Sequence, residues 1–220
     1  MLGSEAVALM KRRLGFRRNL DTECLFELRE AQKRAESISR TQPWFLMQEN
    51  ATITTVANVA TVALPDNFIK ETDTGTSQIR YTPIGSSDSL IGVRMLTKVD
   101  ITNALPYYTE SDGDILVGGP RSYVLENGFI RFFPTPDAAY TFYWNYHAKD
   151  EQIELGEENL WLQHLSDYLI GDAGVRLAMD IRNAQAAQTF TAMYNEGQKQ
   201  LIAGNVEREW SGRDFYMGSN

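Results

Sequence analysis

The sequence Tyr140-Thr-Phe-Tyr-Trp-Asn-Tyr-His147 places an aromatic residue at every even-numbered position from 140 to 146. Successive side chains of a β-strand point to opposite faces of a sheet, so this spacing puts all four rings on one face. The stretch therefore predicts a β-strand that carries a continuous aromatic stripe on one face.

Further strand patterns precede this strand, from Asn50 onward. The clearest is Tyr123-Val-Leu-Glu-Asn-Gly-Phe-Ile-Arg-Phe-Phe133, where Asn127-Gly128 predicts a two-residue hairpin turn with positive φ at both positions. Runs rich in β-branched or aromatic residues, separated by Gly, Ser, Asp and Pro, lie upstream at 51–56, 59–64, 68–72, 78–82 and 95–101. Strands at this spacing predict an antiparallel β-sandwich or barrel-like region.

Helical periodicity flanks the β region on both sides. Upstream, apolar residues recur at intervals of three and four over 21–39, and a shorter helix is expected from Ser4, its N-cap, to Leu14. Downstream, helices are expected over 157–181 and 183–203. Here the first turn carries adjacent glutamates whose charge offsets the helix dipole, Glu157 and Glu158.

The expected fold class is α+β, a helical bundle with an inserted antiparallel β region and an extended C-terminal arm. The bundle combines helices from the two ends of the chain. The expected parts are the N-terminal helices 1–43, the β insertion 44–150, the C-terminal helical pair 151–204 and the arm 205–220.

Composition excludes several classes of protein. The 220 residues carry 21 Lys and Arg against 29 Asp and Glu, a net charge of −8 that argues against tight binding of nucleic acid. A single cysteine, Cys24, excludes an internal disulfide framework and indicates a small buried side chain in a reducing compartment. No apolar run is long enough for a membrane span, and the N-terminus lacks the pattern of a cleaved signal peptide.

No group of residues forms a convincing catalytic or metal site. His164 and Asp167 share a helical face but have no evident third ligand, so a histidine without metal is expected there. Glu154, Glu157 and Glu158 offer carboxylates for sugar cleavage, but helix-dipole compensation accounts for their clustering. We therefore expect no catalytic residues, no cofactor and no metal.

The C-terminal stretch 205–220 combines three large aromatic residues with arginines and acids, without helical or strand periodicity. Aromatic residues and arginine dominate the energetics of protein interfaces. A segment that orders on a partner fits this composition, and so does a C-terminus that folds back on its own bundle.

Several stretches together resemble the head–tail adaptor, or connector, proteins of tailed bacteriophages. They are Pro43-Trp-Phe-Leu46, Val62-Ala-Leu-Pro-Asp-Asn-Phe-Ile-Lys-Glu71, Tyr140–Tyr146 followed by Asp150, and Glu158-Asn-Leu-Trp-Leu-Gln-His-Leu-Ser-Asp-Tyr-Leu-Ile170. The likeness covers nearly the whole chain, and it implies a helical bundle with a β insertion and no enzymatic activity.

The resemblance also implies a place in the virion neck, after synthesis in the host cytoplasm. A homo-oligomeric ring, a dodecamer, would dock beneath the portal protein, extend the channel for double-stranded DNA without binding it specifically, and present a platform to the next neck or tail protein. The arm would grip the portal through Trp210, Arg213, Phe215 and Tyr216. The alternatives are a stopper or tail-tube tier, or a cell-wall-degrading neck enzyme that uses Glu157 or Glu158.

Overall fold

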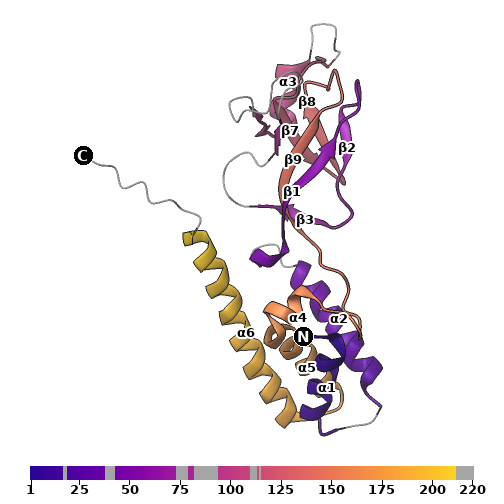
Figure 1. The fold of residues 1–220 in the computed structure, drawn as a ribbon, viewed down its shortest axis with the longest axis vertical. Coiled ribbons are helices and arrows are strands. Elements are labelled where there is room, and N and C mark those ends of the chain that lie inside the picture. Colours follow the sequence, from indigo (N-terminus) through magenta and orange to yellow (C-terminus); the bar gives the residue numbers. More distant parts are fainter. Residues whose placement is uncertain are drawn as a thin grey trace, which may run out of the picture. The chain divides into compact units, whose positions relative to one another are not determined.

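The computed structural model describes residues 1–16, 19–37, 43–72, 79–81, 94–109, 113 and 115–211, with the backbone alone at 47–50 and 207–211. The chain divides into two compact units, Met1–Leu46 with Lys149–Asn220 and Met47–Ala148 (Figure 1). The described residues form six α-helices and two β-sheets, which confirms the predicted α+β class. The second unit is inserted into the sequence of the first.

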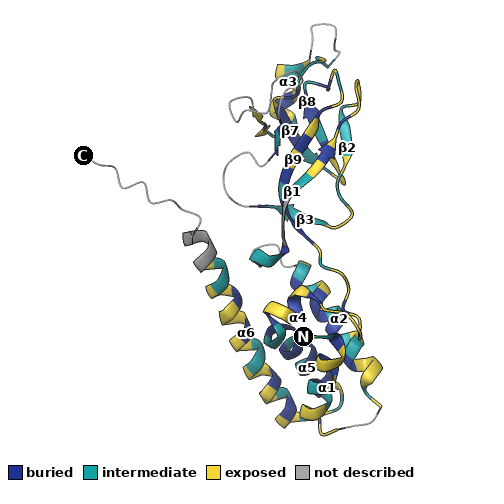
Figure 2. Ribbon diagram, in the orientation of Figure 1, coloured by how far each residue is buried: buried dark blue, intermediate teal, exposed yellow. Residues whose placement is uncertain are grey.

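The first unit, here called the helical unit, is built from helices of both chain ends. They are α1 (Gly3–Arg13), α2 (Asp21–Ser37), a 3₁₀ turn η1 (Trp44–Leu46), α4 (Leu160–His164), α5 (Ser166–Asp180) and α6 (Ala184–Ser211). One side of each longer helix is buried, as Figure 2 shows for α2, α5 and α6. The fully buried side chains at the centre include Met10, Leu28, Leu169 and Phe190.

Two helix starts differ from the sequence prediction. Helix α1 begins before Ser4, because the Leu2 N–H, at the N-cap position, donates to the Glu5 carboxylate at 2.9 Å. Helix α4 begins at Leu160, since the Asn159 side chain caps it by accepting the N–H groups of Trp161 and Leu162 at 3.1 and 3.3 Å. Glu157 and Glu158 therefore precede the cap instead of forming a first helical turn.

The expected single helix over 157–181 is two helices, because the chain breaks at Leu165 with φ −137° and ψ 46°. The second C-terminal helix is longer than expected. Helix α6 continues to Ser211, so the first seven residues of the stretch expected to be an extended arm are helical. That stretch contains good helix formers and no Gly or Pro before Gly212, which sustains a helix even without an apolar face.

The second unit, here called the β unit, contains two sheets. One sheet has the order β1 (Met47–Thr54), β9 (Thr141–Ala148), β4 (Ile79–Tyr81), β5 (Arg94–Met95), and β3 (Phe68–Glu71) also pairs with β9. The other has the order β2 (Thr61–Ala63), β8 (Phe129–Phe133), β7 (Ser122–Glu126), β6 (Thr97–Lys98). Among the described strands neither sheet closes into a barrel, and β6 pairs with β7 in parallel, so the unit is not wholly antiparallel.

The aromatic face predicted for β9 is the core of the β unit. Tyr140, just before β9, and Phe142, Trp144 and Tyr146 are 9%, 0%, 0% and 3% exposed. Phe142 stacks on Phe132 of the other sheet, with ring centroids 4.7 Å apart, so the two sheets share one core. The predicted strand and its aromatic face are therefore confirmed, and the structure shows in addition that this strand is central in its sheet.

Two details of the β unit were predicted incorrectly. The hairpin between β7 and β8 forms as expected, but only Gly128, with φ 83°, has positive φ at its turn. The stretch expected to be a strand up to Ile101 leads into a helix, α3 (Ile101–Tyr108), whose start is capped by Asp100 accepting the Thr102 N–H at 2.8 Å. Helix α3 contains Pro106, which obscures the helical pattern in the sequence.

Candidate functional site

Helices α5 and α6 contact each other through a reciprocal pair of Tyr-x-x-Gly sequences. A Cβ atom on Gly171 of α5 would lie 2.5 Å from the Tyr194 backbone nitrogen, and one on Gly197 of α6 would lie 2.3 Å from the Tyr168 backbone nitrogen. Each glycine is three residues after the tyrosine of its own helix. The backbones therefore meet at distances that only glycine allows at both positions.

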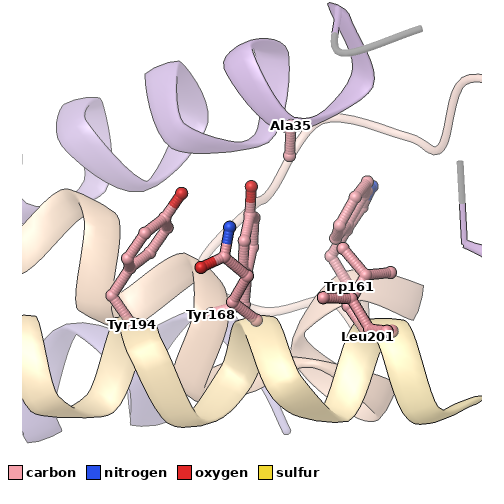
Figure 3. Close-up of a pocket in the computed structure, with 7 residues that line it drawn as sticks. Ala35, Trp161, Tyr168, Tyr194 and Leu201 are labelled. Atoms are coloured by element: carbon pink, nitrogen blue, oxygen red, sulfur yellow. The ribbon is translucent and has the colours of Figure 1, made fainter. Parts of the chain in front are cut away.

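The two tyrosines border a cavity of about 120 Å³ on the helical unit. Their rings lie 5.0 Å apart, and the Trp161 ring follows 6.2 Å from Tyr168, so three rings stand in a row facing α2 (Figure 3). Ala35 of α2 forms the opposite wall, and Leu201 lies at the Trp161 end. Burial raises the pKa of the Tyr168 hydroxyl, which stays protonated at neutral pH. The cavity is thus an aromatic-walled, uncharged recess.

A small aromatic cluster supports α6 just beyond this cavity. Phe45 of η1 stacks on His164 with ring centroids 4.9 Å apart, and Trp44 meets the same imidazole edge-on at 5.1 Å. The Trp44 backbone N–H donates to the Asn205 side chain at 3.2 Å, and a Cβ on Gly204 would lie 3.4 Å from the Trp44 indole nitrogen. These contacts hold α6 at a point nearly two turns before its C-terminal end.

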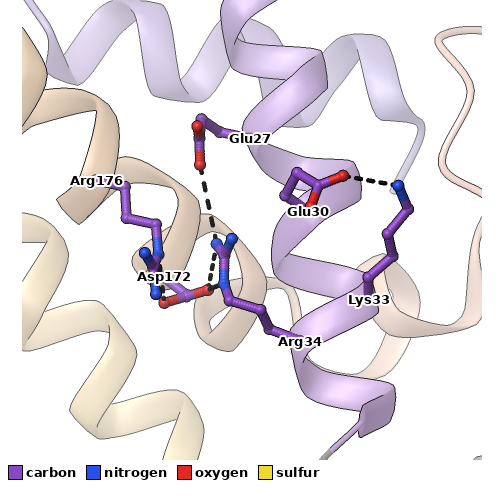
Figure 4. Close-up of polar contacts among 6 residues, drawn as sticks. All are labelled: Glu27, Glu30, Lys33, Arg34, Asp172 and Arg176. Atoms are coloured by element: carbon purple, nitrogen blue, oxygen red, sulfur yellow. Dashed lines mark hydrogen bonds and ion pairs between the residues drawn. The ribbon is translucent and has the colours of Figure 1, made fainter.

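Helix α2 is joined to α5 by a charged pair. The Arg34 guanidinium donates to one Asp172 carboxylate oxygen from Nε at 2.9 Å and from Nη2 at 2.7 Å (Figure 4). Arg176 lies 3.7 Å from the other Asp172 oxygen, and Glu27 lies 3.9 Å from Arg34. Arg34 and Asp172 are partly buried, so the pair orients the two helices more than it stabilises them.

A polar group at the end of α2 holds the chain segment that returns from the β unit. Glu36 Oε1 accepts from Gln32 Nε2, the Asp150 N–H and Trp161 Nε1 at 3.0, 3.2 and 3.1 Å. The Gln32 amide is buried, and it also contacts the backbone at Glu151 and Ile153 at 3.0 and 3.2 Å. Burial raises the pKa of Glu36.

The substitution Glu36→Gln is expected to keep the three hydrogen bonds to this side chain. All three donors bond to Oε1, and glutamine retains one such side-chain oxygen. A raised pKa in the folded state means that ionised Glu36 disfavours folding, so wild-type stability declines as pH rises through that pKa. We expect Glu36→Gln to equal or exceed the wild type in unfolding free energy at pH 7, and to lose that advantage at pH 4. Urea unfolding at both pH values measures this. Glu36→Ala removes the shared acceptor of three donors, of which Gln32 keeps its bond to the Glu151 carbonyl, and it should cost about 3 kcal/mol.

The residues considered as catalytic candidates make contacts that hold parts of the helical unit together. Glu154 accepts from Arg29 at 2.5 Å, while Glu157 and Glu158 contact the start of α1 through their backbones. His164 is stacked in the aromatic cluster, and the described residues contain no group of three or more His, Cys, Asp or Glu placed to hold a metal ion. Cys24 is fully buried, and burial raises its pKa to about 11. Within the described parts of the chain, no helix meets the length and hydropathy needed to cross a bilayer.

Of the four residues predicted to anchor the arm, only Trp210 falls within the described chain. Its backbone belongs to the last turn of α6, and its side chain is not described. Arg213, Phe215 and Tyr216 lie outside the described residues. Sequence reasoning missed the aromatic-walled cavity; the repeated Tyr-x-x-Gly was the signal that two helices meet there.

The described chain is a helical bundle with an inserted two-sheet unit, and the polar groups described above hold helices and chain segments of the bundle together. The family model of the SU10 adaptor protein matches residues 19–215, and the chain belongs to that family of phage structural adaptor proteins. A comparison with curated proteins found no match. The family confirms the resemblance drawn from the sequence, and it places the protein in the virion neck with portal and tail proteins as its general partners.

Proposed function

We propose that the chain assembles into a dodecameric ring beneath the portal, where it extends the DNA channel and links the capsid to the tail. Membership of the SU10 adaptor protein family supports this role. The net charge of −8 per chain also supports it, because an acidic ring repels phosphate and lets double-stranded DNA pass without binding. The chain would be made in the host cytoplasm and built into the virion.

The observation that carries the proposal is the position of α6. This helix is fixed along α5 by glycine contacts, is held again at Asn205, and runs on to Ser211. The last nine residues of the chain therefore follow directly on a helix that is fixed to the helical unit. We propose that these residues, with Trp210, form the portal-binding arm, with Arg213, Phe215 and Tyr216 as further anchors.

Removing the two terminal aromatic side chains tests the arm. The double substitution Phe215→Ala and Tyr216→Ala should weaken binding to purified portal rings at least tenfold, since aromatic anchors supply about 2 kcal/mol or more at interfaces. Co-sedimentation with portal rings measures the affinity. The matched control is Tyr107→Ala, an aromatic side chain of α3 that is 80% exposed and should leave binding unchanged. Unchanged binding by the double variant would contradict the arm as the portal contact.

A further inference from the structure

We propose that the aromatic-walled cavity of one copy of the chain receives the Phe26 side chain of the next copy, in a head-to-tail contact. This contact rests on the proposed function, because only an assembly of identical copies repeats it. It names the two surfaces that would join neighbouring copies, and both surfaces belong to the described residues of the helical unit.

Phe26 is an aromatic side chain that a well-anchored helix leaves in water. It lies on α2 and is 57% exposed, whereas Cys24 and Leu28 on either side of it in the sequence are fully buried. Burial of the exposed part of the ring against a partner would be favourable, and a side chain on a fixed helix loses little freedom when it binds. The helical unit therefore presents Phe26 as a ready contact for another molecule.

The cavity has the size and chemistry to receive a phenyl ring. A closed apolar cavity of about 150 Å³ holds benzene. The cavity described here, of about 120 Å³, is open to the surface, since its lining includes the exposed residues Gln198 and Ile202. An entering ring would lie beside the three aromatic rings of the wall, Trp161, Tyr168 and Tyr194, and aromatic pairs attract each other at such contacts (Figure 3). It would also cover Ile202, which is 52% exposed.

Phe26 and the cavity lie on opposite sides of α2. Ala35, which lines the cavity, follows Phe26 by nine residues, and this spacing places the two side chains about 180° apart around the helix. A chain therefore cannot fill its own cavity with its own Phe26, and a two-fold dimer cannot fill both cavities at once. The contact is of the heterologous kind, which produces a closed ring when the rotation between copies closes.

Charges beside the two surfaces are complementary. Glu23 is exposed and lies one turn before Phe26 on the same side of α2. Beside the cavity, Lys199 lies between Gln198 and Ile202 in the sequence of α6, and its side chain is 76% exposed. A second copy thus brings both an aromatic ring for the cavity and a carboxylate for the ammonium group at its edge, and such complementarity favours this partner over others.

Two variants that each lose one half of the contact test it by sedimentation velocity of the full chain without portal. Phe26→Ser removes the ring, and Gln198→Trp places an indole over the cavity. At about 100 μM, which populates a contact with a Kd in the micromolar range, the wild type should form dimers and larger species. Each variant alone should self-associate at least tenfold more weakly, because an aromatic anchor dominates a small interface. An equal mixture of the two should form a one-to-one dimer and nothing larger, since each copy keeps the half that the other has lost.

The matched control is Phe16→Ser, which removes a phenyl ring that is 70% exposed but follows α1 outside any helix, and it should associate as the wild type does. Ile202→Asp, at the edge of the cavity, is a second cavity variant that should behave like Gln198→Trp. A monomeric wild type, a Phe26→Ser variant that associates as the wild type does, or a failure of Phe26→Ser to pair with both cavity variants would overturn the proposed contact.

Co-sedimentation with portal rings separates this contact from the proposed function. A chain that binds portal rings while the complementary variants fail to pair would contradict the head-to-tail contact alone. Pairing of the complementary variants, in a chain that does not bind portal rings, would support the contact and contradict the place of the chain beneath the portal.

Discussion

Gly171→Ala is expected to lower the free energy of unfolding of the helical unit by about 3 kcal/mol, the upper part of the range for overpacked cores. The direction of this change in stability is informative. Helix propensity alone would make the alanine variant more stable than the wild type by about 1 kcal/mol, because the position lies inside α5. The new methyl group would lie 2.5 Å from the Tyr194 backbone nitrogen and 2.6 Å from its Cα. Backbone atoms cannot rotate aside, so α5 and α6 must separate.

A double-mutant cycle tests the cause of that loss. Gly197→Ala should cost a similar amount, because its methyl group would meet the Tyr168 backbone in the same way. Separating the two helices relieves both clashes at once, so the double variant should lose about 4 kcal/mol rather than the sum of the single losses. Urea unfolding followed by far-ultraviolet circular dichroism measures all four proteins.

The control for this prediction is Gly156→Ala, at a position where an added Cβ meets no atom within 4 Å and φ is not in the left-handed range. It should change stability by less than about 0.5 kcal/mol, as surface substitutions usually do. Strict additivity of Gly171→Ala and Gly197→Ala would contradict a shared helix separation. A more stable Gly171→Ala variant would show that the two helices do not meet at this point.

Elements with a strong local pattern were predictable from the sequence. The strand Thr141–Ala148 was found because alternation of large aromatic and small or polar residues is a property of neighbouring positions. Helix Asp21–Ser37 was found for the same reason, with apolar intervals of three and four. Helix α3 was missed because Pro106 interrupts its pattern, although Asp100 before Thr102 is a typical N-cap.

The candidate site was only partly predictable, because long-range contacts assemble it. Arg34 and Asp172 form an ion pair although they are 138 residues apart in the sequence. No local sequence pattern indicates that these two residues are partners. The aromatic cavity draws residues from four helices. Gly171 of α5 and Gly197 of α6 each meet the backbone of the other helix, and the sequence did not identify them as counterparts. The end of α6 was placed too early, since a helix that extends beyond its core shows no apolar periodicity.

Trp144→Ala is expected to destabilise the β unit by about 4 kcal/mol, as deletion of a buried indole leaves a large cavity. Trp144 is fully buried at the centre of β9, where it stacks on Phe68 at 5.1 Å and lies 5.0 Å from the Tyr146 ring. We expect hydrogen exchange along Thr141–Ala148 to accelerate strongly. Exchange in α5 should change little, because the helical unit has its own core.

Trp144→Phe separates the two contributions of this side chain, its volume and its N–H group. The indole N–H is buried and has no hydrogen-bond partner among the described residues, so its removal forfeits no bond. Phenylalanine keeps most of the ring contacts, and its cost should stay below about 1.5 kcal/mol. The other three tryptophans belong to the helical unit, so fluorescence of Trp144→Phe reports unfolding of that unit alone. Equal losses of unfolding free energy in Trp144→Ala and Trp144→Phe would contradict ring packing as the main contribution of this side chain, and would assign it to the N–H group. Accelerated hydrogen exchange in α5 of Trp144→Ala would mean that the two units unfold together.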